Sequence, residues 1–264
     1  MITILVQAAD GTILASSEHP EEAFLSVDRV YQPGDIIRIT GGRHLRVQMD
    51  QALPSGEVWL PDGKMTWPVP CGEHRLAYAP GLFEAPRHII TASSVPVDTL
   101  RRVRNVACNP ADLRGDTDFY PHCTANVETR NEACFCARNV IDGLRLNTFH
   151  GEWPFQSWGI GAREDAWCLL DLGRPVVAEK MALTLRADFP HDAYWTAGRV
   201  LLSDGESLAF SLQKTGDRQW IDLKNRTVRW LRLEQLIKSD DPSAFPALRQ
   251  WEVFGRDLTP TRTE

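Results

Sequence analysis

Short β-type runs separated by turn residues constrain the fold of this 264-residue chain more than any other feature. Helical periodicity is scarce, whereas runs rich in β-branched and aromatic residues recur between Gly, Pro, Asp and Asn. The clearest runs are ITILVQ, TILAS, IIRIT, LRVQM, EVWLP, WCLLDLG, KMALTLRA, RVLLSDG, RTVRWLRLEQLI and RQWEVFG. Because no helices alternate with these runs, they predict an all-β protein built as a β-sandwich or jelly roll.

Turn signals and composition divide the chain into two predicted domains. Asp10-Gly11 lies between two β-type runs and is a strong hairpin signal. Pro, Ser and Ala concentrate in residues 80–104, which is typical of a connecting segment. We therefore predict a small all-β domain over residues 1–95, with a linker at its end, and a larger jelly-roll domain over residues 96–264.

The charge pattern argues against two classes of partner. The net charge is −6, and acidic and basic residues are interspersed without a basic block, so neither nucleic acid nor an anionic membrane is expected to bind. The N-terminus has no basic region ahead of its apolar run and reads as a strand, which predicts a cytoplasmic protein. In that compartment the six cysteines are expected to be reduced thiols. The oligomeric state does not follow from the sequence.

The stretch from residue 139 to residue 158 combines polar and aromatic side chains around a predicted turn. Asp142-Gly143 starts the turn, and His150, Glu152, Trp153 and Trp158 follow it. Polar groups beside flat aromatic rings suit a ligand with both hydroxyls and apolar faces, such as a sugar. The alternative is that the tryptophans belong to the core.

A second stretch, RADFPHDAYW, has the same character and follows the predicted strand MALTL. Its candidate ligand-binding residues are Arg186, Asp188, His191, Asp192 and Trp195. Arg and Asp supply planar hydrogen-bonding groups for hydroxyls, and Arg186 also suits the carboxylate of an acidic sugar. The alternative is an ordinary solvated loop with salt bridges. If loops from different strands meet at one rim, we expect Trp153 or Trp158 to approach Arg186, His191 or Trp195.

The second half resembles the discoidin domain, which is also called the coagulation-factor C-type or galactose-binding-like domain. The similarity lies in five short motifs in the family's order, namely RNVACNP, ARNVIDG, WCLLDLG, VLLSDG and WEVFG. The combination of TANVETR, HGEWPFQSWGI and RADFPHDAYW resembles a group of bacterial proteins labelled carbohydrate-binding, over the full chain. The resemblance implies an eight-stranded antiparallel jelly-roll sandwich that holds its ligand on loops at one rim.

The same resemblance implies a structural calcium ion that holds the loop after Asp142-Gly143. The residues that match its motif are Asp142, Asn147, Thr148 and Glu252. Hard oxygen ligands of this kind suit calcium. The loop departs from the family pattern, however, because Leu144 and Arg145 stand where acidic or small polar residues are frequent.

These observations predict a non-catalytic carbohydrate-binding protein, with an acidic sugar as one candidate ligand. Two alternatives belong to other classes. A carbohydrate-active enzyme would use Glu152, Asp188 or His191, and would need two carboxylates at catalytic spacing. A protein-interaction module would instead show an apolar exposed patch.

Overall fold

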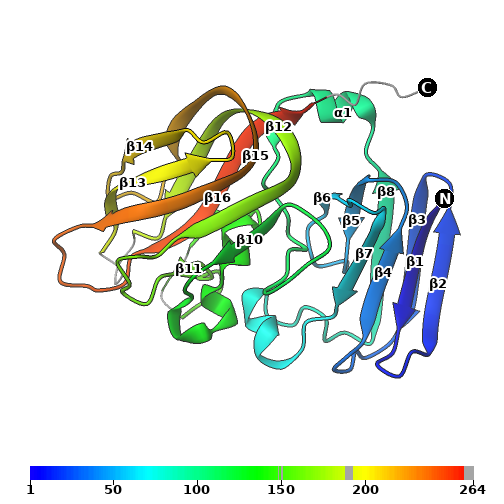
Figure 1. Cartoon of the computed structure of the whole chain (residues 1–264). Helices are drawn as coiled ribbons and strands as arrows, with labels where there is room; N and C mark the ends of the chain where they lie inside the picture. Colours follow the sequence, from blue (N-terminus) through cyan, green and yellow to red (C-terminus); the bar gives the residue numbers. More distant parts are fainter. Residues whose placement is uncertain (148, 150, 188–192, 259–264) are drawn as a thin grey trace.

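The computed structural model describes residues 1–147, 149, 151–187 and 193–258. Strands account for 48% of the residues and helices for 9%, which confirms the all-β prediction. The strands of the first half lie together on one side of the molecule, and those of the second half lie on the other (Figure 1). Within the described ranges, no helix combines the length and the apolar character that a bilayer crossing requires.

The first half is a sandwich of two four-stranded antiparallel sheets. One sheet has the order β2 (Ile13–His19), β1 (Ile2–Gln7), β4 (Ile36–Thr40) and β7 (Lys64–Pro68). The other has the order β3 (Glu22–Asp28), β8 (Arg87–Ser94), β5 (His44–Gln48) and β6 (Gly56–Trp59).

Alternation along the strands explains why these two sheets pack face to face. In β1, Ile2, Ile4 and Val6 are buried while the residues between them are partly exposed. The strand β3 alternates in the same way, with every second side chain buried. Successive side chains of a strand point to opposite faces, so each sheet has one apolar face, and the two apolar faces form the first core.

The second half is one strongly bent antiparallel sheet that closes around its own core. The main order is β11 (Trp158–Gly159), β16 (Ala247–Asp257), β12 (Cys168–Leu185), β15 (Gln219–Lys238), β13 (Trp195–Leu202) and β14 (Ser207–Ser211). Two short strands extend it, because β10 (His122–Ala125) pairs with β12 and β9 (Arg104–Asn105) pairs with β16.

Two long strands allow this sheet to fold over. The strand β12 pairs with β10 over its first residues and with β16 over its last, and its register shifts between Asp171 and Val176. Gly173, with φ of 69°, lies at that shift, and Tyr120 packs where a side chain at Gly173 would point. The irregular point bends the strand, so its two ends belong to opposite walls of the sandwich.

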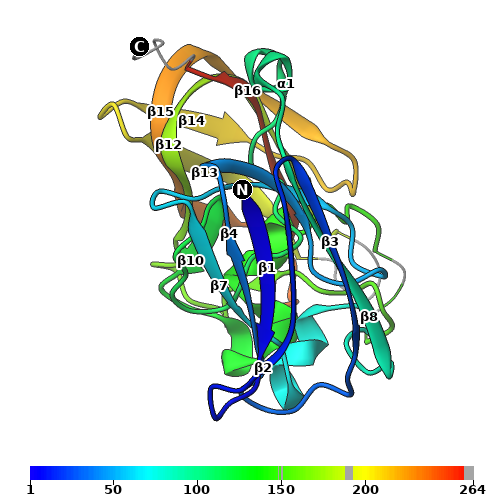
Figure 2. The same ribbon diagram turned by 90° about the vertical axis from the view of Figure 1, so that its right-hand side faces the viewer.

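The two halves share packing across the expected boundary at residue 95, which falls between β8 and α1 (Val97–Arg101). Ala111, Phe119, Ala133 and Cys136 come from beyond the boundary but pack into the first core. Four short 3-10 helices lie where the halves meet, namely η1 (Gly72–Ala77), η2 (Thr129–Asn131), η3 (Ala133–Phe135) and η4 (Ala137–Ile141). Figures 1 and 2 show the cyan η1 beside the green helices.

Candidate binding site

A cleft forms where η1 and the loop that follows it meet residues 151–156 of the second half. Gln156 joins the two sides, because its Nε2 donates to the carbonyl of Leu76 over 3.0 Å. Buried Arg138 also joins them, because its Nη1 donates to the carbonyl of Ala77 over 3.0 Å and its Nη2 to that of Pro110 over 2.8 Å. These bonds fix segment 72–84 against the loop of the second half.

Trp153 stands between two hollows of this cleft, and its side chain remains 37% exposed. The larger hollow has a volume of about 450 Å³, and the smaller one measures about 130 Å³. The larger volume lies within the range of small-molecule sites, roughly 300–1,000 Å³. We call the two hollows together the Trp153 cleft. Its larger hollow is lined by Gly72, Arg75, Leu76, Tyr78, Ala79, Pro80, Gly81, Leu82, Glu84, Gly151, Trp153, Phe155 and Gln156.

Hydrogen-bonding groups border the aromatic ring in the larger hollow. Arg75 Nη1 and Glu84 Oε1 form an ion pair of 2.6 Å, and both side chains are partly exposed. The Gln156 amide also borders the hollow, but it is buried, and its oxygen accepts from the backbone N–H of Phe155 over 3.0 Å, so the exposed donors and acceptors come from Arg75 and Glu84. The hollow therefore offers a ligand one aromatic face and both donors and acceptors, which is the combination that recognises hydroxyls on an apolar ring.

Segment 72–84 is held in place because its apolar side chains, such as Tyr78, Leu82 and Phe83, pack into the first core. Phe83 has φ of 64°, a left-handed conformation that is costly for a residue with a side chain. Its buried ring holds it there, with edge contacts to Trp67 at 5.3 Å and to Tyr78 at 5.4 Å between ring centroids. Burial raises the pKa of Tyr78 to about 12, so its phenol stays neutral, and it donates to the carbonyl of Asp112 over 3.1 Å.

The two sequence stretches expected to bind a ligand do meet, because Arg186 Nη1 donates to the carbonyl of Phe155 over 3.0 Å. They meet inside the protein, however. Trp158 and Trp195 are 0% and 1% exposed, their ring centroids lie 5.9 Å apart, and Arg186 is 1% exposed. This burial corrects the placement of these three side chains on an open rim. Trp158 and Trp195 are buried because both belong to the second core, together with Leu185, the residue before Arg186.

The other predicted ligand-binding residues divide into two groups. Glu152 is exposed and forms a β-bridge with Phe149, but it lines neither hollow of the cleft. His150, Asp188, His191 and Asp192 lie outside the described residues. Trp153 is therefore the exposed aromatic of the predicted set that lines a ligand-sized cavity in the described structure, whereas Trp195, which borders another hollow of about 430 Å³, is 1% exposed. The binding role of the whole set stays a prediction.

The residues expected to hold calcium have other partners in the described structure. Both carboxylate oxygens of Glu252 accept from Arg218, over 2.6 and 2.7 Å. Asp142 faces buried Arg249, with Nη1 and Oδ2 3.3 Å apart, and burial raises the pKa of Asp142 above its usual range although that charge opposes the rise. Asn147 has a buried amide without a hydrogen-bond partner among the described residues, and Thr148 lies outside them.

As they are placed, Asp142 and Glu252 do not fit a shared cation, because each carboxylate already contacts a guanidinium. A positive ion at either position would also lie against an arginine charge. Among the described residues, no group of three or more His, Cys, Asp and Glu side chains is arranged to hold a metal. Calcium binding stays a prediction, and no part of the function is derived through it.

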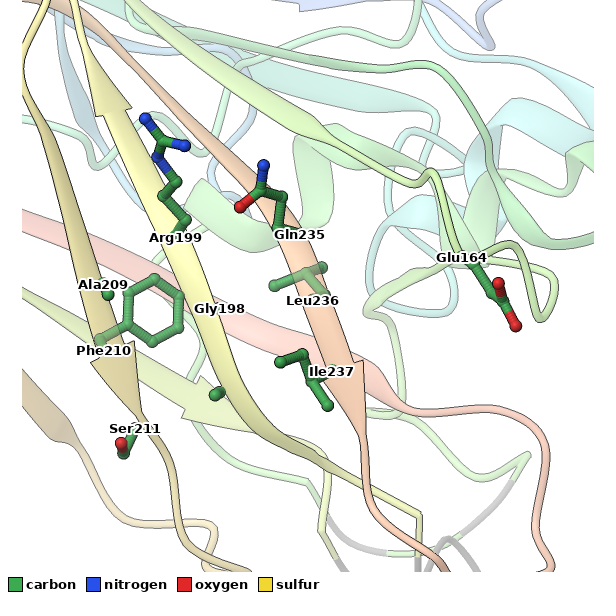
Figure 3. Close-up of a pocket in the computed structure, with 10 residues that line it drawn as sticks. Glu164, Gly198, Arg199, Ala209, Phe210, Ser211, Gln235, Leu236 and Ile237 are labelled. Carbon is green, nitrogen blue, oxygen red and sulfur yellow. The ribbon is translucent and has the colours of Figure 1, made fainter.

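A second, larger depression of about 580 Å³ lies over β13, β14 and β15 (Figure 3). Much of its lining is small, as at Ala197, Gly198 and Ala209, and the ring of Phe210 beside them is buried. Arg199 is engaged, because its Nη2 donates to Ser207 Oγ over 2.6 Å. This depression lacks an exposed aromatic face, so the Trp153 cleft is the better candidate for a sugar despite its smaller volume.

Sequence reasoning missed the N-terminal wall of the cleft. Tyr78, Arg75 and Glu84 belong to a domain in which the sequence shows no chemical motif. The available signal was indirect. The turn pair Pro80-Gly81 lies between oppositely charged Arg75 and Glu84, which is compatible with a loop closed by an ion pair.

Comparisons with known proteins give distant structural similarity. No family model matches the chain, and no curated protein matches it. A chitosan-binding module from a chitosanase/glucanase of Paenibacillus sp. IK-5 is 18% identical, with 58% of this chain and 100% of that chain covered and a TM-score of 0.40. A fucose-binding module of Streptococcus pneumoniae, SpX-3, is 17% identical, with 57% and 96% covered and a TM-score of 0.40.

The lectin domain of lectinolysin, solved with Lewis B antigen, is 18% identical, with 60% of this chain and 99% of that chain covered and a TM-score of 0.43. Similarity at this level carries no argument about what this chain binds.

Proposed function

We propose that this chain is a non-catalytic carbohydrate-binding protein that holds its sugar in the Trp153 cleft. The observation that carries the proposal is an exposed tryptophan inside a ligand-sized cavity, bordered by Gln156 and by the Arg75–Glu84 pair. A pyranose has an apolar face that stacks on an aromatic ring and hydroxyls that need donors and acceptors at its edge. Both requirements are present in the same hollow, because Trp153 supplies the ring and the partly exposed Arg75–Glu84 pair supplies donors and acceptors.

The proposal includes a discoidin-type second half. Its support is the position of the five sequence motifs within the fold. RNVACNP begins at β9, ARNVIDG covers η4, and WCLLDLG begins β12. VLLSDG ends β13, and WEVFG lies within β16. The motifs thus lie on strands of the second half and on the turn before the cleft loop. This placement is expected if together they specify one type of domain.

Replacing Trp153 with alanine tests the site. We expect wild-type protein to bind members of a panel of neutral and acidic mono- and disaccharides in isothermal titration calorimetry. The W153A variant should bind its best ligand at least about tenfold more weakly, or about 1.4 kcal/mol, because it loses the stacking surface.

Phe245→Ala serves as the control, because Phe245 is also an exposed aromatic but does not line the cleft. Equal affinities for wild type and W153A would overturn the site. Cleavage of the disaccharide during the titration would instead make the chain an enzyme.

A further inference from the structure

A second exposed tryptophan lies on the outer face of the second half, away from the Trp153 cleft. All nine tryptophans lie within the described residues, and Trp220 is the most exposed of them at 49%. It belongs to β15, where its register partner on β12 is Ala182. Met181 and Leu183 point into the core, so Ala182 and Trp220 face outward.

Trp220 forms an aromatic pair with Phe254 of β16, although β12 runs between their strands. Their ring centroids lie 5.3 Å apart with the planes at 49°. The pair can close over β12 because the residue beneath is Ala182, whose side chain is small and fully buried. The two tilted rings, which come from separate strands, form one apolar patch on the outer face, called here the Trp220 plate.

Two cations flank the Trp220 plate. Lys180 Nζ lies 4.2 Å from the centroid of the Trp220 ring and 5.9 Å from that of Phe254. Arg218 Cζ lies 5.7 Å from Trp220 and 5.9 Å from Phe254. Cations at these distances are attracted to the faces of aromatic rings.

The two cations differ in their electrostatic partners. Arg218 is neutralised by Glu252, to which it donates through Nε and Nη2, so that Nη1 remains for a ligand hydroxyl. Lys180 is exposed and makes no ion pair within the described part of the chain. The acidic side chain nearest in register is Asp222, whose carboxylate accepts from the backbone N–H of Lys224 over 2.8 Å.

We propose that Trp220, Phe254, Lys180 and the Arg218–Glu252 pair form a second sugar subsite that prefers an acidic sugar. The sugar ring stacks on Trp220, its carboxylate contacts the Lys180 ammonium, and one of its hydroxyls meets Arg218 Nη1, while Glu252 holds the guanidinium in place from the buried side. This inference rests on the proposed function, because it extends carbohydrate binding to a second surface. The two sites share no residue, so each can be removed without altering the other.

The test uses a trisaccharide of galacturonic acid and its methyl ester, which has the same shape without the charges. Full-length wild type, Trp220→Ala, Lys180→Gln, Trp153→Ala and Lys64→Gln are titrated by calorimetry at low salt. Lys64 is an exposed lysine on β7 of the first half and controls for general charge loss.

We expect W220A and K180Q to weaken binding of the acid at the second site at least about tenfold, with K64Q unchanged. K180Q should also bring the acid and its ester to the same affinity, because the lysine is what distinguishes them. Melting temperatures of K180Q and wild type should agree, since Lys180 is exposed.

Each outcome separates this inference from the proposed function. If W220A and K180Q bind the acid as wild type does while W153A does not, the second subsite is overturned and the Trp153 cleft stands. If W153A binds as wild type does while W220A fails, the cleft is overturned and the second subsite stands. Equal wild-type affinity for the acid and the ester overturns the preference for an acidic sugar.

Discussion

His122 is a buried histidine whose ring is held by one buried carboxylate. Its Nδ1 lies 2.6 Å from Asp112 Oδ1, and the other oxygen of Asp112 accepts from the backbone N–H of Cys123 over 3.0 Å. Burial alone would lower the pKa of His122, but the charge of Asp112 and its hydrogen bond outweigh burial and raise that pKa above 6.5. The imidazolium therefore contributes to the stability of the folded state.

The sign of this pKa shift predicts how stability changes with pH. A raised folded-state pKa means that the contribution is complete below the unfolded value, about 6.5, and is lost as the pH rises through the folded value. His122→Gln removes this dependence. We expect the unfolding free energy of wild type to fall by up to about 1.4 kcal/mol per pH unit relative to H122Q above pH 6.5. Urea unfolding at several pH values measures this difference, and parallel pH profiles would contradict it.

The pKa of His44 is shifted in the opposite direction, so His44 affects the stability of the fold in a lower pH range. Burial lowers its pKa to about 4, and the charge of nearby Arg174 adds to this effect. The contribution of neutral His44 to the stability of the fold is complete above about pH 6.5, the unfolded pKa, and is lost as the pH falls toward 4. The two histidines therefore affect stability on different sides of pH 6.5, so the His122 experiment stays interpretable when it is confined to the higher range.

At the scale of elements, Gly255 shows how closely β16 approaches β12. A Cβ at Gly255 would lie 2.4 Å from the carbonyl oxygen of Val177 and 3.0 Å from Ala178 Cα. The strand cannot move aside, because Gly255 pairs with Ala178 on one side and with Arg104 of β9 on the other. The glycine of the WEVFG motif is thus required by backbone packing.

We expect Gly255→Ala to lower the free energy of unfolding by about 2–3 kcal/mol, because the added methyl group meets backbone atoms that cannot rotate away. Chemical denaturation with a constant m-value would measure the loss. Gly216→Ala is the matched control, since no atom lies within 4 Å of a Cβ at that position. Equal stability of the two variants would contradict this account of the strand contact.

Local patterns were sufficient to predict most strands but not how they join. ITILVQ and IIRIT coincide with β1 and β4. In contrast, WCLLDLG and KMALTLRA looked like two strands, whereas both belong to β12. Gly173 and Pro175 between them are ordinary turn signals, but the chain bends there without reversing, because both ends keep partners in the sheet.

The candidate site, like the fold, could be predicted only in part from the sequence. Trp153 was predictable because a loop with aromatic and polar residues is visible in the sequence. Burial of Trp158 and Trp195 was not, since an aromatic residue looks the same in a sequence whether it faces solvent or the core. Tyr78 and Glu84 reach the cleft only through packing between distant segments, which has no local signature.

On the scale of the whole molecule, a chain of ion pairs connects the two halves. Arg104 bonds Glu57 of β6 over 2.7 Å and Asp257 of β16 over 2.5 Å, and Asp257 also bonds Arg174. Burial alone would raise the pKa of Asp257, but Arg174 and Arg104 outweigh burial and lower that pKa below its usual range. Together with the packing of Phe119 into the first core, these pairs predict that the halves unfold as one unit.

Arg104→Met should lower the unfolding free energy by about 1–3 kcal/mol, because Glu57 and Asp257 lose the cation they share while each keeps one other arginine, Arg46 and Arg174 respectively. Arg46→Met is the control. Arg46 pairs with the same Glu57, but it is about half exposed, so its loss should cost at most about 1 kcal/mol. Differential scanning calorimetry measures both variants. Two separate transitions in the wild type would contradict the prediction that the halves unfold together.

The cleft has one wall from each half of the molecule, and this division affects how its recognition could diversify. Segment 72–84 supplies Arg75 and Glu84 at the surface, while Phe83 anchors it from below. Trp153 comes from the other half, in the loop that precedes β11. If the cleft holds a sugar as we propose, exchanging the outer residues of segment 72–84 would change which hydroxyl pattern is accepted, while the Trp153 ring stays in place. The residues that select the sugar and the ring that binds its apolar face would then be able to change independently during evolution.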